Sequence, residues 1–303
     1  WSYPNATAWD KADENAPEAW TSPMKPFASR HSQGAKKIFD GAQIADGQTI
    51  QKDLDDAMAA ICAHPNMAPF ISRQLIQRLV TSNPSKTYLS DVAKVFNDNG
   101  QGVKGDLRAV VSAILLHPEA RSATPPANFG KQREPVIRFA NFLRAFDAKS
   151  PSGRNAIHYL ESADNGLGQS PLLSPSVFNF FSPNFRPAGS IAQAGLVAPE
   201  FQITTETTVV GGLNFFANLV KNKSYGNGDT KLSLNLAPLE GIASNTEALI
   251  GQINAVFFNY QMSAKMQARM RKMLNGMDDT DKVGRVRAAL TLTSLSPEFV
   301  VQK

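Results

Sequence analysis

A proline-rich stretch in the middle of the chain puts the strongest constraint on its fold. Four prolines fall within eighteen residues of Ser170-Pro-Leu-Leu-Ser-Pro-Ser-Val-Phe-Asn-Phe-Phe-Ser-Pro-Asn-Phe-Arg-Pro187. Because each proline lacks an amide donor and fixes its own φ, no long helix can pass through this stretch. Its leucines, valine and phenylalanines each stabilise a fold by about 1.5–3 kcal/mol when they are buried. The sequence therefore predicts an irregular, rigid loop whose phenylalanines pack between helices.

The composition is that of a globular protein. The chain has 303 residues, of which 42% are hydrophobic, so a sizeable core can form. The formal net charge is +5, and the basic residues are spread along the whole length. A nucleic-acid binder normally concentrates its basic residues in one patch with interleaved aromatics, so this class of partner is not indicated. No apolar run approaches the ~20 residues that a membrane span requires.

Apolar residues recur at helical spacing through most of the chain, and many of these runs begin at a good capping residue. Asp106, Asn245 and Ser263 are expected to cap helices, and Pro135 is expected at the first position of another. Shorter or longer helices are predicted from Thr49 to the His64-Pro65 pair, over 154–160, over 204–220 and over 281–295. The fold class is therefore mainly α, an irregular multi-helix globular domain with a small β element and a buried Pro/Phe-rich loop.

The clearest strand signal is the alternation of Leu232, Leu234 and Leu236 with polar residues. A lone strand needs a partner, and we expect it between Lys37 and Ile50. The domain organisation predicted from these patterns is an extended Trp/Pro-rich arm with short strands over 1–50, followed by one helical domain over 51–303.

Several stretches resemble a bacterial family catalogued as domain of unknown function 1800, and they occur in the family's order over about residues 20–303. They are His31-Ser-Gln-Gly-Ala-Lys36, His64-Pro-Asn-Met-Ala-Pro-Phe-Ile-Ser-Arg-Gln-Leu75, Val95-Phe-Asn-Asp-Asn-Gly100, Arg133-Glu-Pro-Val136, Pro175-Ser-Val-Phe-Asn-Phe180, Pro199-Glu-Phe-Gln-Ile203 and Ser296-Pro-Glu-Phe-Val-Val-Gln-Lys303. The chain resembles the second, C-terminal half of that family.

The resemblance implies a helical protein that bacteria export, located in the periplasm or outside the cell. It also implies a protein partner, because many family members are encoded beside an exported protein of an alkaline-phosphatase-like or sulfatase-like family. An additional helical half is expected before the segment that matches Trp1, with an acidic motif of the type Glu-Asn-Tyr-Ala-Arg-Glu-Leu. That motif is absent from this sequence.

Few residues suggest chemistry. His31 is the one catalytic candidate, since it lies in a polar segment near Arg30 and Lys36, which together could meet an anionic ligand. A surface histidine in a loop is the simpler interpretation. The spacing of the four histidines does not indicate a metal site, and no cofactor is predicted. Cys62 lies on an apolar helical run and is expected to be a buried, inert thiol.

Aromatic residues of the proline-rich stretch are the other binding candidates. Phe178, Phe180 and Phe181 could stack on a sugar or on a partner, although core packing is their expected role. Arg133 and Glu134, at a helix start, could form a buried ion pair with each other. Two functions follow: a binding or assembly component that docks the phosphatase-like partner, or a hydrolase of an extracellular polymer that uses His31 and residues of the missing half.

Overall fold

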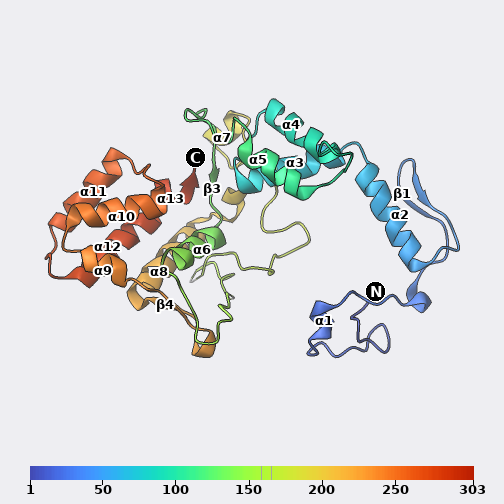
Figure 1. Ribbon diagram of the computed structural model, residues 1–303, viewed down its shortest axis with the longest axis horizontal. Helices are drawn as coiled ribbons and strands as arrows, with labels where there is room; N and C mark the ends of the chain where they lie inside the picture. Colours follow the sequence, from blue (N-terminus) through green and yellow to red (C-terminus); the bar gives the residue numbers. More distant parts are fainter. Residues whose placement is uncertain (158, 165) are drawn as a thin grey trace. The chain divides into compact units, whose positions relative to one another are not determined.

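The computed structural model describes residues 1–157, 159–164 and 166–303, and these form two compact units, Trp1–Ile71 and Ser72–Lys303. Figure 1 shows the elements, coloured along the chain. Helices dominate, and the strands are short, so the predicted mainly α class is confirmed. No helix in the described residues is long and apolar enough to cross a membrane.

The N-terminal unit contains a proline-rich arm, a hairpin and a helix. Its elements are α1 (Glu18–Thr21), the 3-10 helix η1 (Ala28–Arg30), β1 (Lys36–Phe39), β2 (Ala42–Ile44), α2 (Ile50–Ala63) and the first residues of α3 (Met67–Leu79). β1 and β2 pair with each other in antiparallel register, with Lys36 opposite Ile44. Thr49 caps α2, as expected, by accepting a hydrogen bond from the amide of Lys52. Cys62 is exposed, so the prediction of a buried thiol was wrong.

The C-terminal unit contains the remaining helices. They are α4 (Lys86–Asn97), α5 (Leu107–Leu116), α6 (Pro135–Ala145), α7 (Ser190–Gln193), η2 (Pro199–Ile203), α8 (Glu206–Asn222), η3 (Gly228–Thr230), α9 (Ala237–Ile242), α10 (Thr246–Phe258), α11 (Ala264–Asn275), α12 (Lys282–Leu295) and α13 (Pro297–Val300). Asp106, Asn245 and Ser263 cap α5, α10 and α11 through their side chains, and Pro135 opens α6. The helix starts were therefore predicted well from cap chemistry.

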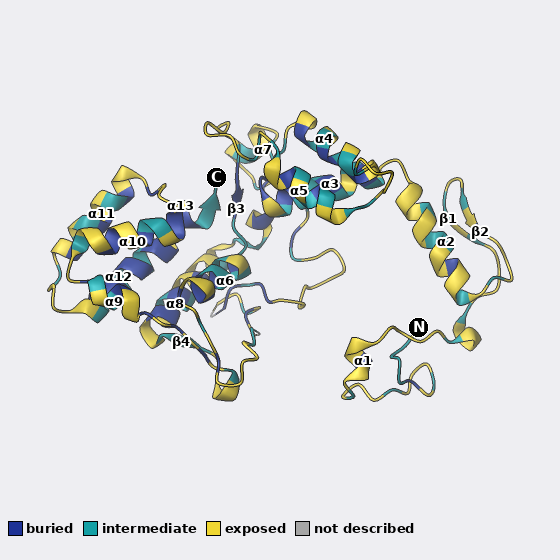
Figure 2. Cartoon of the chain, in the orientation of Figure 1, coloured by how far each residue is buried: buried dark blue, intermediate teal, exposed yellow. Residues whose placement is uncertain are grey.

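Helix α12 is the central helix of the group formed by α8 to α13. It packs against α8, α9, α10 and α11, the group drawn in orange and red in Figure 1 together with α8. Several of its faces are buried, and Arg285 on this helix is buried as well. The Arg285 guanidinium donates to the carbonyls of Ala243 and Leu274 and to the hydroxyl of Thr246. Figure 2 shows the resulting contrast between the dark, buried faces of α10 and α12 and the mostly exposed α2. The hydrogen bonds of Arg285 satisfy a guanidinium that could not otherwise be buried.

The predicted helix over 204–220 is present as α8, with Thr205 in the capping position. A Cβ added at Gly211 would lie 2.4 Å from the carbonyl oxygen of Ala163, whereas one added at Gly212 would meet nothing within 4 Å. Gly211 therefore allows the segment around Ala163 to approach α8 closely. By contrast, the short helix predicted over 154–160 is wrong for the described residues of that range; His158 lies outside them.

The small β elements pair differently from the prediction. β5 (Leu232–Ser233) pairs with β4 (Ser224–Tyr225), not with the region from Lys37 to Ile50, which forms its own hairpin. The alternation that suggested the strand is nevertheless real, because Leu232, Leu234 and Leu236 are all buried. A third antiparallel pair joins β3 (Lys131–Gln132) to β6 (Val301–Gln302).

The proline-rich loop is irregular, as predicted, but most of it is not buried. Val177 and Phe178 are 95% and 81% exposed, and Leu172 and Leu173 also face solvent. Figure 2 draws this loop in yellow, the colour of exposed residues. Only Phe181, at 2% exposure, lies in the core. The prediction that the phenylalanines of this loop pack between helices was therefore wrong for the tip of the loop and right for its base.

Candidate functional site

His31 and Lys36 meet at one carboxylate in the N-terminal unit. Asp53, in the first turn of α2, places its Oδ2 atom 2.7 Å from His31 Nε2 and 2.6 Å from Lys36 Nζ. Lys36 also donates to the carbonyls of Ser32 and Gly34. Asp53 thus ties the segment before the hairpin to the start of the helix.

The charges in this cluster compensate one another. The hydrogen bond from Lys36 lowers the pKa of Asp53 below its usual value, and the bond from His31 acts in the same direction, while burial opposes both. Gln33 lies 3.2 Å from His31 Nδ1, so an amide N–H donated there leaves Nε2–H to donate to Asp53. Both ring nitrogens of His31 are therefore engaged, and within the described residues neither contacts a hydroxyl or thiol that could serve as a nucleophile.

Arg30 does not join His31 and Lys36. Its guanidinium lies over the ring of Trp9, 4.3 Å from the ring centroid, in a cation–π contact. The sequence-predicted residues of this segment are therefore divided between two local contacts. The structure brings His31 and Lys36 together through Asp53, a residue that the sequence analysis did not single out.

The three phenylalanine candidates differ in their surroundings. Phe178 stands exposed at the tip of the proline-rich loop, Phe180 is half-buried, and Phe181 is buried below the guanidinium of Arg78, 4.2 Å from its ring centroid. We define the apolar loop as residues 171–180, with its tip at 172–178. Its exposed side chains are an apolar surface that nothing in the described residues covers.

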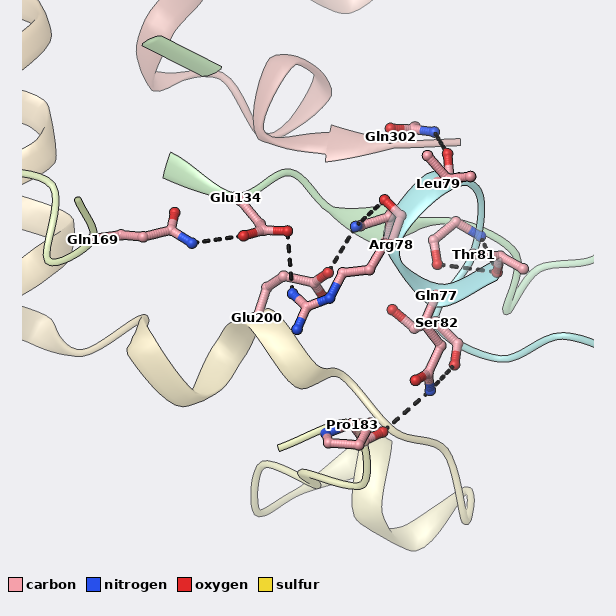
Figure 3. A network of polar contacts seen from close by, with 12 residues as sticks. Gln77, Arg78, Leu79, Thr81, Ser82, Glu134, Gln169, Pro183, Glu200 and Gln302 are labelled. Atoms are coloured by element: carbon pink, nitrogen blue, oxygen red, sulfur yellow. Dashed lines mark hydrogen bonds and ion pairs between the residues drawn. The ribbon is translucent and has the colours of Figure 1, made fainter. Parts of the chain in front are cut away.

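The two ends of the apolar loop are held by one network of polar contacts, shown in Figure 3. At the N-terminal end, Gln169 donates to Glu134 Oε2 at 2.6 Å and accepts from the amide of Val136. Glu134 Oε1 in turn lies 3.2 Å from Arg78 Nη1. Arg78 covers Phe181 at the C-terminal end of the loop. We call this series from Gln169 to Phe181 the clamp.

Further bonds fix the C-terminal end of the loop. Gln77 Nε2 donates to the carbonyl of Pro183 at 3.1 Å, a contact that also appears in Figure 3. The amide of Ser182 donates to Gln202 Oε1 at 2.7 Å. Hydrogen bonds near the tip, in contrast, stay local: the amide of Leu173 donates to Ser170, and that of Asn179 donates to Ser176. Among the described residues, the base is therefore bonded to the body of the unit, whereas the hydrogen bonds of the tip stay within the loop.

A buried ion pair lies directly beside the clamp. Lys131 Nζ is 2.8 Å from Glu200 Oε1, and the two side chains are only 4% and 1% exposed. Lys131 also donates to the carbonyl of Arg78 at 2.8 Å, which connects β3 and η2 to the end of α3. The second carboxylate oxygen of Glu200 has no hydrogen-bond partner among the described residues. Lys131 is thus the one neutralising contact of this buried carboxylate within the part of the chain that the structure describes.

A comparison with known protein families identifies the chain. The family model described as "Protein of unknown function (DUF1800)" matches residues 5–301. The chain belongs to this family. No curated protein and no solved structure matches it. The resemblance found in the sequence motifs is thereby confirmed at the level of the DUF1800 family.

The clamp residues were largely missed by sequence reasoning. Glu134 was considered a partner of Arg133, but the structure pairs it with Arg78 instead, so that prediction was wrong. The DUF1800 resemblance offered a signal for Glu134 and for the neighbouring Glu200, since each lies in a segment that carries that resemblance. Among the described residues, no group of three or more His, Cys, Asp or Glu side chains could hold a metal ion.

Proposed function

We propose that the protein is a binding or assembly component at the exterior of the bacterial cell, and that its apolar loop docks a protein partner. The observation that carries the proposal is the exposure of Leu172, Leu173, Val177 and Phe178 on a loop whose two ends are clamped. Aromatic and aliphatic side chains that stand free of the core are typical anchors of protein interfaces.

The construction of the loop favours binding energetically. Prolines limit the conformations open to the loop before it binds, and the clamp fixes the separation of its ends, so little order remains to be gained on docking. Burying each of the four large side chains is expected to contribute about 1.5–3 kcal/mol. A surface of this kind can therefore supply much of the affinity of a stable complex.

For the partner, we propose the exported phosphatase-like or sulfatase-like protein whose association the family resemblance implies. The periplasm or the cell exterior is the corresponding location. The net charge of +5 also favours a partner with an acidic face around an apolar pocket.

Co-purification of the two proteins, produced together from the same bacterium, tests the proposal. The double variant V177S/F178S removes two anchors and is expected to weaken the complex at least a hundredfold, since about 3–6 kcal/mol of burial is lost. The control is V103S/L116S, which removes two other exposed apolar side chains, 50% and 63% exposed, elsewhere in the same unit. Equal binding by both variants, or no association of the wild-type chain with the phosphatase-like protein, would refute the proposal.

The hydrolase remains the second candidate because a carboxylate lies 2.7 Å from His31. Its test is the hydrolysis of extracellular polysaccharides and esters by the full-length protein. Activity that disappears in H31Q and persists in V177S/F178S would establish this candidate. Activity that H31Q retains would remove His31 from consideration.

A further inference from the structure

One cavity of the C-terminal unit shares no lining residue with the apolar loop or its clamp. It has a volume of about 880 Å³ and lies where α6, the end of α10 and the C-terminal segment meet. Arg133, Arg144 and Asn141 line it, together with Val256 and the buried Phe257 and Phe258. The volume lies within the range of ~300–1,000 Å³ that is typical of small-molecule sites.

Basic side chains outnumber acidic ones around this cavity. No carboxylate lies within ion-pair distance of either Arg133 or Arg144 in the described residues. Glu298 also lines the cavity, but its two oxygens accept hydrogen bonds from the amide and hydroxyl of Ser263, where they support the start of α11. Lys303 lines the cavity as well and adds a further basic side chain.

Arg133 is partly withdrawn from water. Burial lowers its pKa, and its guanidinium lies 5.5 Å from the ring centroid of Phe299. A guanidinium in a partly desolvated place gains stability when an anion lies beside it.

We infer that this cavity binds a small organic oxyanion, a ring-bearing molecule with a carboxylate, sulfate or phosphate group. The planar guanidiniums of Arg133 and Arg144 match the oxygens of such a group, which they can hold through paired N–H donors. Asn141 supplies a further polar contact, and Val256, which is 44% exposed, offers apolar surface to the ring. This site is separate from the proposed docking loop and does not depend on it.

Calorimetric titration of the full chain with four probes tests the inference. Glucuronate and glucose 6-sulfate each carry an oxyanion on a ring, glucose carries the ring alone, and inorganic sulfate carries the charge alone. We expect both ring-bearing anions to bind at least tenfold more tightly than glucose or sulfate, and to weaken as salt is raised. The tighter of the two anions identifies the oxyanion that the site prefers. Equal binding of glucose, or no binding of either anion, would overturn the inference.

Two variants locate the binding. R144Q removes an exposed guanidinium and is expected to weaken glucuronate or glucose 6-sulfate binding at least tenfold, whereas R144K should keep most of it. The matched control R108Q removes another exposed arginine of the same unit and should bind as the wild type does. Circular dichroism of each variant without probe confirms its fold. Unchanged affinity in R144Q would place the anion elsewhere and overturn the assignment, whatever the outcome of the partner experiment.

Discussion

Replacing Lys131 by methionine tests how the buried ion pair supports the clamp. The change K131M leaves Glu200 buried without its neutralising contact, because the second carboxylate oxygen already lacks a partner in the described residues. Removing one member of a buried pair typically costs about 3–5 kcal/mol. Proton uptake limits that cost, because a buried carboxylate can be neutralised by a proton instead of by Lys131. The carboxyl group of unfolded glutamic acid titrates near pH 4.3, and each pH unit above that value adds about 1.36 kcal/mol to the free energy of protonation, which gives about 3.7 kcal/mol at pH 7.

The same reasoning predicts how the loss of stability varies with pH. Because a protonated carboxyl group carries no charge to bury, the penalty of K131M should fall from about 3–4 kcal/mol at pH 7 to about 1 kcal/mol at pH 5. Urea unfolding followed by far-ultraviolet circular dichroism measures it, since most helices lie in the C-terminal unit. The three tryptophans all lie in the N-terminal unit, so their fluorescence reports on that unit instead.

Two further variants make this experiment decisive. K149M removes a lysine whose ion pair with Asp147 is 71% exposed on both sides, and it should change stability by less than about 0.5 kcal/mol. The double variant K131M/E200L replaces the buried pair by apolar side chains and should regain most of the stability that K131M loses. A loss in K131M that is independent of pH, or a double variant less stable than K131M alone, would refute the reasoning.

Three other changes have definite expected outcomes. G211A should lower the free energy of unfolding by at least about 1 kcal/mol, because its Cβ meets the carbonyl of Ala163, whereas G212A should raise it by about 0.5–1 kcal/mol. Thermal unfolding measures both variants, and equal effects would contradict the close approach of Ala163 to Gly211. Because the pKa of Asp53 is lowered, its contribution to stability is present above the ordinary value of 3.8 and is lost as the pH falls through the lower pKa of the folded state. The difference in stability between wild type and D53N should therefore vanish in that acidic range. A difference that persists there would contradict the prediction. Burial raises the pKa of Tyr88 to about 12. We therefore expect Tyr88 to contribute no tyrosinate absorbance near pH 10 in the folded wild type, and to contribute it near pH 12 or on unfolding; the difference between wild type and Y88F isolates this contribution. Titration of Tyr88 near pH 10 in the folded chain would contradict the expectation.

The helices could be predicted because their signals are local. A capping side chain and the amide that it accepts from lie two or three residues apart, as Asp106 and Ala109 do, so a short window of sequence contains the whole interaction. The spacing of apolar residues gives the buried face in the same way. The pairing of β4 with β5 was missed because strands of two residues carry almost no pattern of their own.

The apolar loop shows where this reasoning stops. Apolar side chains are normally buried, so the sequence favoured a loop packed between helices. Whether a given phenylalanine is covered depends, however, on contacts from distant segments. Gln77 and Pro183, which help to fix the base, are 106 residues apart, and Arg78 and Glu134 are 56 apart. The same distance in sequence hid the true partner of Glu134, since the adjacent Arg133 was the simpler choice. For His31 the segment was correctly selected, but its carboxylate, Asp53, lies 22 residues further along the chain.

The division of the apolar loop into a fixed base and a free tip has an evolutionary consequence. Substitutions between Leu172 and Phe178 are expected to leave the interior intact, because the large side chains of this tip are exposed and do not belong to the core. Mutation can therefore exchange the tip while Gln169 and Phe181 preserve the frame that presents it. A lineage could acquire a new binding preference in this way without rebuilding the protein that displays it.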